Sequence, residues 1–175
     1  EHPKVGIYGF HIFDKKLVKF FNGLGIKSGP KINIRIPKII LSDKKLLKRF
    51  IRGLFDTDGN LYFDKSYSAK NPKNNHPIIK LGTVSKKLCE DVFNSFKIFN
   101  LNPRMKNPYK GKRDKNIVYT VLLYRKKDIE FFIKEIGFKN PKHHTKWQVF
   151  EMIGYCPSNT KLKDRIELLT NSKNL

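Results

Sequence analysis

Two aspartates, Asp56 and Asp58, stand where a predicted helix over residues 43–57 finishes. Acidic side chains at a helix C-terminus oppose the helix dipole, so another interaction has to stabilise them there. A divalent cation would do so, because Mg²⁺ prefers carboxylate oxygens as ligands. The same residues also fit an ordinary Asx-rich turn with Asp58-Gly59 at its tip, which needs no ligand.

Small residues on one face of this helix predict a second helix beside it. Gly53 lies inside an apolar stretch, where glycine costs about 0.5–1 kcal/mol relative to alanine. Thr57 follows four residues later and therefore shares its face. Because a small-xxx-small face lets two helix backbones approach closely, we predict a helix interface through Gly53 and Thr57. Gly59 is expected to take a positive φ as the C-cap.

The charge of the chain predicts a polyanionic partner. Among 175 residues, 37 Lys and Arg outnumber 15 Asp and Glu, which gives a net charge of +22. Hydrophobic residues make up 39% and aromatic residues 13%, which is enough for a folded core and excludes a disordered basic tail. Nucleic acid is the leading candidate partner. A ribosome-associated domain or a basic surface kept for solubility are the alternatives.

The sequence lacks the residues that a disulfide scaffold, a zinc site or a membrane span would need. Two cysteines, Cys89 and Cys156, cannot build a disulfide scaffold or a four-cysteine zinc site, and we interpret both as packing residues. His143 and His144 have no complementary Cys or His spacing for zinc, so a backbone contact or a helix start is expected. No apolar run approaches the roughly 18 residues of a membrane span, and no signal peptide is visible. We expect a cytoplasmic, intracellular protein with no membrane partner.

The elements that position these residues follow from periodicity and capping signals. Their order is helix, two strands, helix, two strands, helix, which predicts an α+β fold with an antiparallel sheet. Ser42 and Ser85 are the expected N-caps of two of the helices. Helices are predicted over residues 15–24, 43–57, 86–99, 127–136, 144–152 and 161–170, and strands over residues 5–13, 31–36, 60–65, 78–84, 104–107 and 117–124.

The segment from Gly53 to Gly59 resembles the signature of the LAGLIDADG homing endonucleases. The residues that fall on the motif's identities are Gly53, Leu54, Asp56, Asp58 and Gly59, whereas Arg52 departs from it and is expected to face outward. The resemblance covers residues 1–156, because the following strands, capped helix, basic hairpin and Gly137–Lys142 loop occur in the family's order. It implies the family's saddle-shaped antiparallel sheet backed by helices, and it looks closest to the two-repeat archaeal and intein-associated members.

The resemblance implies a site-specific endonuclease that hydrolyses double-stranded DNA with a divalent metal. In the family, two motif helices pack about a pseudo-two-fold axis and the last acid of each motif reaches the metal. Carried over, Asp58 is the catalytic acid and binds Mg²⁺ (or Mn²⁺), Thr57 offers its carbonyl, and Asp56 fixes the helix end. Lys142 takes the family's loop-lysine position, with Lys31 as its first-repeat equivalent. The alternative is a non-cleaving scaffold used as an RNA maturase or a transcriptional regulator.

A basic hairpin supplies the predicted contacts to DNA. Residues 104–115 hold six cations in twelve residues, and a two-stranded ribbon of this kind fits the major groove. Tyr62, Asp64, Lys80, Gly82 and Thr83 are expected to share one face of the adjoining sheet. The predicted DNA-binding residues are Lys80, Arg104, Lys106, Lys110, Lys112, Arg113 and Lys115.

An internal comparison predicts a repeat. Residues 8–21 parallel residues 119–132 at a constant offset of 111, and Pro30-Lys31 match Pro141-Lys142 at the same offset. We interpret residues 1–41 as the C-terminal part of a first repeat, 42–156 as a complete repeat and 157–175 as a C-terminal helical tail. Since one acid cannot cut two strands, a second motif helix is expected from an upstream repeat or from a homodimer mate.

Overall fold

The centre of the molecule is a four-stranded antiparallel sheet in the order β1-β2-β4-β3. The computed structural model describes residues 14–26, 29–65, 73–112 and 115–171. The predicted α+β class is confirmed, while the strand expected over residues 5–13 lies outside the described residues. The strands are β1 (Gly59–Lys65), β2 (Asn74–Thr83), β3 (Arg104–Tyr109) and β4 (Val118–Leu123). The helices are α1 (Lys15–Gly23), the 3₁₀ turn η1 (Lys31–Asn33), α2 (Lys38–Leu41), α3 (Lys44–Thr57), α4 (Lys86–Ile98), α5 (Lys126–Phe131), the π-helical turn η2 (Phe132–Ile136), α6 (Pro141–Ile153) and α7 (Leu162–Asn171).

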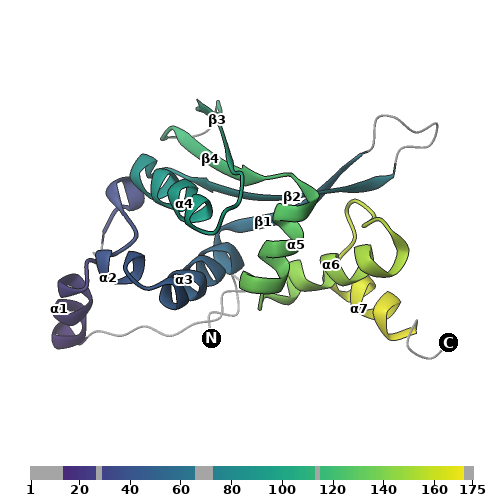
Figure 1. The fold of residues 1–175 in the computed structure, drawn as a ribbon, viewed down its shortest axis with the longest axis horizontal. Coiled ribbons are helices and arrows are strands. Elements are labelled where there is room, and N and C mark those ends of the chain that lie inside the picture. Colours follow the sequence, from purple (N-terminus) through teal and green to yellow (C-terminus); the bar gives the residue numbers. More distant parts are fainter. Residues whose placement is uncertain (1–13, 27–28, 66–72, 113–114, 172–175) are drawn as a thin grey trace.

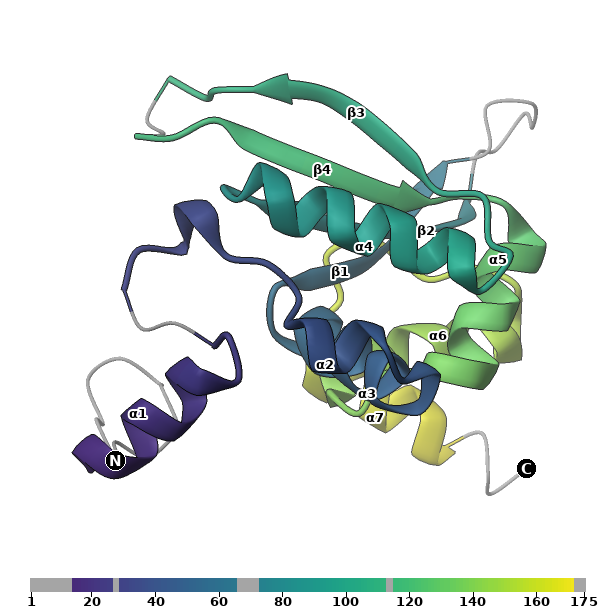
Figure 2. The same cartoon turned by 60° about the vertical axis from the view of Figure 1, so that its left-hand side comes forward.

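The helices gather on one side of the sheet, which we call its inner face (Figures 1 and 2). Phe55 of α3, Phe96 of α4 and Phe132 of η2 are fully buried there, with ring centroids 5.3–6.1 Å apart. Aromatic pairs at such separations stabilise a core beyond their buried area alone. The strand residues that meet them are Leu61, Phe63, Ile79, Leu81, Val121 and Leu123.

Strand register decides which residues share the opposite, outer face. Asn60 pairs with Lys80, Lys80 with Leu122, and Leu122 with Arg104. Directly paired residues share a face, and side chains along a strand alternate between faces. Lys80 and Arg104 therefore lie on the outer face. Thr83, which was expected to join Lys80 and Gly82, has the opposite parity, so that prediction is wrong.

The N-cap of α3 is Asp43 and not Ser42. The Asp43 carboxylate accepts hydrogen bonds from the backbone N–H groups of Lys45 and Leu46 at 2.6 and 3.1 Å. Ser42 instead lies at the end of α2 and donates its hydroxyl to the carbonyl of Ile39. We did not predict α2, because we interpreted Pro37 as a break. Ser85 caps α4 as expected, accepting from Leu88.

Three further elements differ from prediction. Residues 31–36 form η1 and an extended segment that joins no strand within the described part of the chain. Helix α6 begins at Pro141 and not at residue 144, because Asn140 caps it and proline is favoured in a first turn. The predicted helix over 127–136 is divided into α5 and η2.

Candidate functional site

Asp58 is exposed at the point where α3 ends and β1 is about to begin. Its backbone N–H donates to the carbonyl of Leu54 at 2.9 Å, and its side chain is 47% exposed. Lys31 Nζ lies 3.6 Å from Asp58 Oδ2. Both line a surface hollow of about 280 Å³ together with residues 82–84 and Val118. The carboxylate is thus accessible beside the ends of two strands.

Gly59 is required by close packing and not by a positive φ. A Cβ atom at this position would lie 2.6 Å from both the Cα and the carbonyl oxygen of Phe55. Gly59 is buried and starts β1, and it is absent from the glycines with positive φ. The predicted left-handed C-cap is therefore wrong. The chain turns so tightly against α3 that only a hydrogen atom fits, and this turn sets the position of Asp58.

Asp56 anchors the loop that precedes α6. Its carboxylate accepts hydrogen bonds from the backbone N–H groups of Lys139 and Asn140, both at 3.0 Å. Asn140 in turn donates its side-chain amide to the carbonyl of Asp56 at 2.8 Å. These contacts agree with the prediction that Asp56 fixes the helix end, and they leave Asp58 as the more accessible of the two acids.

Of the two predicted lysines, Lys31 is the one that the structure brings to Asp58. Lys142 lies exposed in the first turn of α6, where its backbone N–H donates to Asn140 and its carbonyl accepts from Arg165. No contact between Lys142 and Asp58 occurs among the described residues. A catalytic part for Lys142 stays a prediction.

The exposed face of α3 is lined by its small residues. Apart from α3 itself, no atom of the described residues lies within 4 Å of a Cβ built on Gly53. Thr57 is exposed, and its hydroxyl donates to the carbonyls of Gly53 and Leu54. The opposite face is buried in the core through Leu47, Ile51 and Phe55. Arg52 does not face fully outward as expected: it is half-buried and donates to the carbonyl of Ile136. As far as the described residues go, the Gly53 face thus has room for another helix.

A hard metal ion would find only part of its ligands here. Mg²⁺ takes six oxygens and usually combines one or two carboxylates with substrate phosphates and water. Within the described residues, no three His, Cys, Asp or Glu side chains are grouped to hold a metal. The exposed Asp58 carboxylate next to the Thr57 carbonyl fits a shared site, in which substrate, water and a second acid complete the shell.

The outer face of the sheet and its hairpin are strongly basic. Arg104 lies over the ring of Tyr124 at 4.5 Å, and β3 is exposed along its whole length. Lys106 pairs with Thr120, so it shares the outer face with Lys80 and Arg104. Lys110, Lys112 and Lys115 are exposed in the connection to β4, while Arg113 lies outside the described residues.

His143 has a structural role in the core. From the sequence we expected only that it would contact the backbone or start a helix. It is buried, its Nδ1 accepts from the backbone N–H of Leu61 at 3.4 Å, and its ring lies 4.9 Å from that of Phe138. Burial, and then the charges of Lys146 and Lys142, lower the pKa of His143 from 6.5 to about 4. The imidazole is therefore neutral near pH 7.

Acidification is expected to destabilise the fold through His143. Between about pH 6.5 and about pH 4 the unfolded chain binds a proton at this imidazole that the folded chain refuses. The free energy of unfolding should therefore fall by up to about 3 kcal/mol across that window. Urea unfolding measured from about pH 7.5 to about pH 4.5 checks this. His143→Gln should flatten the pH dependence, whereas His144→Gln, an exposed neighbour, should not; an unchanged slope in His143→Gln would contradict the assignment.

Comparison with known proteins places the site within a family domain. A LAGLIDADG-like domain matches residues 45–137, which is more than half of the chain and includes Asp58 and the whole sheet. Among curated proteins, the replication factor C small subunit of Methanocaldococcus jannaschii is 24% identical over 132 residues. That match covers 75% of this chain and 6% of the relative, so the chain spans only a small part of that protein. Within the described residues, no helix is long and apolar enough to cross a bilayer.

Proposed function

The chain belongs to the LAGLIDADG family, and from this membership and the position of Asp58 we propose that it hydrolyses double-stranded DNA at specific sites with a divalent metal. Membership supports a homing endonuclease or a related nucleic-acid-binding function. The observation that carries the finer proposal is an exposed carboxylate at the end of the motif helix. The hollow beside Asp58 is also lined by Gly82, which shares the outer face with Lys80, and we propose that a backbone phosphate of bound DNA reaches Asp58 from this side.

Asp58 and the Thr57 carbonyl are the groups that we propose to hold Mg²⁺ or Mn²⁺. The metal, when bound, supplies polarisation of the phosphoryl oxygens and a water of lowered pKa. Lys31 places a positive charge 3.6 Å from Asp58, where it can stabilise the charge that develops on the phosphate. Lys142 is proposed for the same task on the basis of its position in the family's loop.

A second motif helix is proposed to pack on the Gly53 and Thr57 face. Helix α1 supports a two-repeat arrangement, because none of its residues is buried. Val18 and Phe21 are 39% and 40% exposed, yet their counterparts at an offset of 111, Ile129 and Phe132, are fully buried. A first-repeat core would cover α1 as α3, α4 and the sheet cover η2. Residues 1–41, 42–156 and 157–175 remain our proposed divisions, and an upstream repeat or a homodimer mate would supply the second helix.

DNA binding through the outer face should be steeply salt-dependent. Several phosphate contacts lower affinity by on the order of 10³–10⁵ between about 50 and 200 mM salt. Replacing Arg104 or Lys106 by Ala should weaken duplex binding and lower the slope of log affinity against log salt by about one each. Fluorescence anisotropy with a labelled duplex measures both. Lys45→Ala, on the helical side of the sheet, is the matched control, and an equal effect there would contradict binding by the outer face.

The proposal is tested by incubating the chain, alone and joined to a second motif helix, with supercoiled DNA carrying a library of sites. Linear product with Mg²⁺ and none with EDTA supports an endonuclease. The mass in solution of the chain alone shows whether it forms a homodimer or needs the joined second helix. Binding without cleavage in every assembly would overturn the enzyme and favour the RNA maturase or the transcriptional regulator. Because Asp58 is the one acid among the described residues that line the surface hollow, the joined form is the critical sample.

A further inference from the structure

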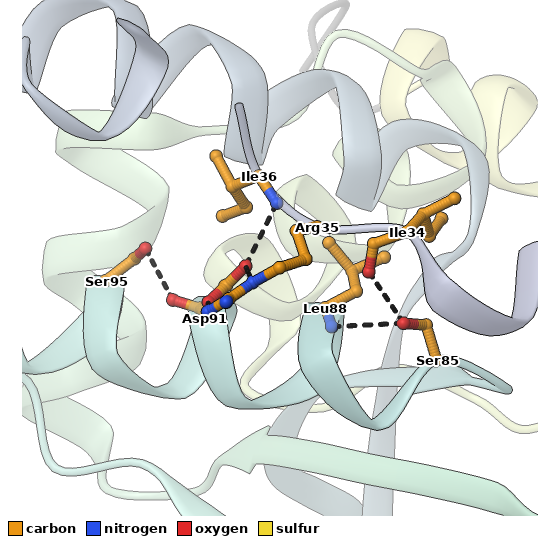
Figure 3. A network of polar contacts seen from close by, with 7 residues as sticks. All are labelled: Ile34, Arg35, Ile36, Ser85, Leu88, Asp91 and Ser95. Carbon is orange, nitrogen blue, oxygen red and sulfur yellow. Dashed lines mark hydrogen bonds and ion pairs between the residues drawn. The ribbon is translucent and has the colours of Figure 1, made fainter. Parts of the chain in front are cut away.

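Residues 30–37, which we call the strap, run across α4 and bond to its side chains (Figure 3). An extended backbone outside a sheet still needs partners for its N–H and C=O groups. Ser85 donates its hydroxyl to the carbonyl of Ile34 at 2.7 Å. The backbone N–H of Ile36 donates to Asp91 Oδ2 at 3.1 Å. Side chains of α4 thus take the place of a neighbouring strand.

Asp91 makes the strongest of these contacts. Arg35 donates Nε to Asp91 Oδ2 at 3.1 Å and Nη2 to Asp91 Oδ1 at 2.7 Å. The Asp91 side chain is only 5% exposed, whereas Arg35 remains 60% exposed. A buried carboxylate is costly unless it is paired and fully hydrogen-bonded, and Asp91 receives three hydrogen bonds from the strap. Its geometry therefore determines the path of Arg35 and Ile36.

Lys31 depends on this path for its position beside Asp58. Its side chain is 69% exposed and its ion pair with Asp58 measures 3.6 Å. Exposed ion pairs of this kind contribute little free energy and cannot hold a long side chain in place. Lys31 is the first residue of the turn η1, and Ile34 and Arg35 follow directly after this turn. Ile34 is bonded to Ser85, the N-cap of α4, and Arg35 is bonded to Asp91 in α4.

We propose that Asp91 is a positioning residue for DNA cleavage, because it fixes the strap through Arg35 and Ile36 and thereby places Lys31 at Asp58. The effect of Asp91 on cleavage rests on the proposed function, but its effect on the position of Lys31 does not. The sequence offered no signal for the pairing, since Asp91 lies on a helix 55 residues from Ile36.

A carbodiimide cross-link tests the positioning without any DNA. The reagent joins a carboxylate to a neighbouring amine as an amide with loss of water, and peptide mass spectrometry quantifies the product. Lys31 should couple to Asp58, and Lys48 should couple to Glu135, a pair 2.6 Å apart that does not involve the strap. In Arg35→Glu the repulsion from Asp91 should lower the Lys31–Asp58 yield several-fold, and Arg35→Lys should retain it. The Lys48–Glu135 yield should be unchanged in both; an undiminished Lys31–Asp58 yield in Arg35→Glu would overturn the proposal.

Cleavage kinetics test the catalytic consequence in the assembled protein. Asp91→Asn should lower the cleavage rate several-fold at unchanged DNA affinity, and it should have little further effect when Lys31 is already Ala. A purely structural part for Asp91 would instead lower the rate equally in both backgrounds, which would overturn the proposal. If the assembled wild-type protein does not cleave DNA but the cross-link still depends on Arg35, the proposed function fails while the placement of Lys31 by Asp91 stands.

Discussion

Replacing Asp58 by Asn is expected to abolish DNA cleavage and to leave DNA binding intact. The amide has the same shape but is neutral, so it is a far weaker ligand for a hard cation than a carboxylate. The side chain is 47% exposed, so the fold should not change. Removing one group that stabilises charge in the transition state costs on the order of 10²–10³-fold in rate, and losing a metal ligand should cost at least as much. Binding should be equal or slightly tighter, because a negative charge leaves the DNA surface.

Asp64→Asn is the matched control for this change. Asp64 is also an exposed aspartate, six residues further along β1, and its replacement removes the same charge. The measurement is the rate of linearisation of a supercoiled substrate with Mg²⁺, beside duplex affinity by anisotropy. Undiminished cleavage in Asp58→Asn would remove Asp58 from the metal site. Loss of cleavage in Asp64→Asn as well would show that net charge, and not a ligand, is responsible.

Replacing Gly59 by Ala is expected to destabilise the whole domain. The added Cβ would lie 2.6 Å from backbone atoms of Phe55, and backbone inside a buried helix cannot yield as a flexible side chain would. Overpacking of this kind typically costs about 1–3 kcal/mol. The same displacement should move Asp58, the neighbouring residue, so cleavage should fall further than the loss of folded protein explains. Urea unfolding gives the free energy, and cleavage per folded molecule gives the second effect.

Gly53→Ala provides the comparison within the same helix. Outside α3 itself, no atom of the described part of the chain lies within 4 Å of a Cβ at that position, so alanine should raise the stability of the isolated chain by about 0.5–1 kcal/mol. If a second motif helix packs on this face, the same methyl group should weaken assembly. Equal unfolding free energies for Gly53→Ala and Gly59→Ala would contradict the packing argument, and unaffected assembly in Gly53→Ala would count against the proposed interface.

Local patterns predicted the elements well. The cap at Ser85 and the periodicity of the following apolar residues led to α4. The strand predicted over residues 78–84 is part of β2, which begins earlier, at Asn74. One prediction failed because two neighbouring residues could each serve as the N-cap of the same helix. Ser42 and Asp43 are both good caps, and only the docking of α2 assigned the cap to Asp43.

The sequence by itself determined the basic character of the chain, the order of helices and strands from α3 through α4 to β4, the family motif and the placement of Asp58 at a helix end. These properties depend on composition and on short-range spacing, which are present in any stretch of the chain. The tertiary structure alone decided that Lys31 lies beside Asp58, that Gly59 is crowded by Phe55 and that Asp91 holds the strap. Each of those contacts depends on the packed geometry of folded segments, most of them far apart in sequence, and such contacts leave no periodic trace in the residues that make them.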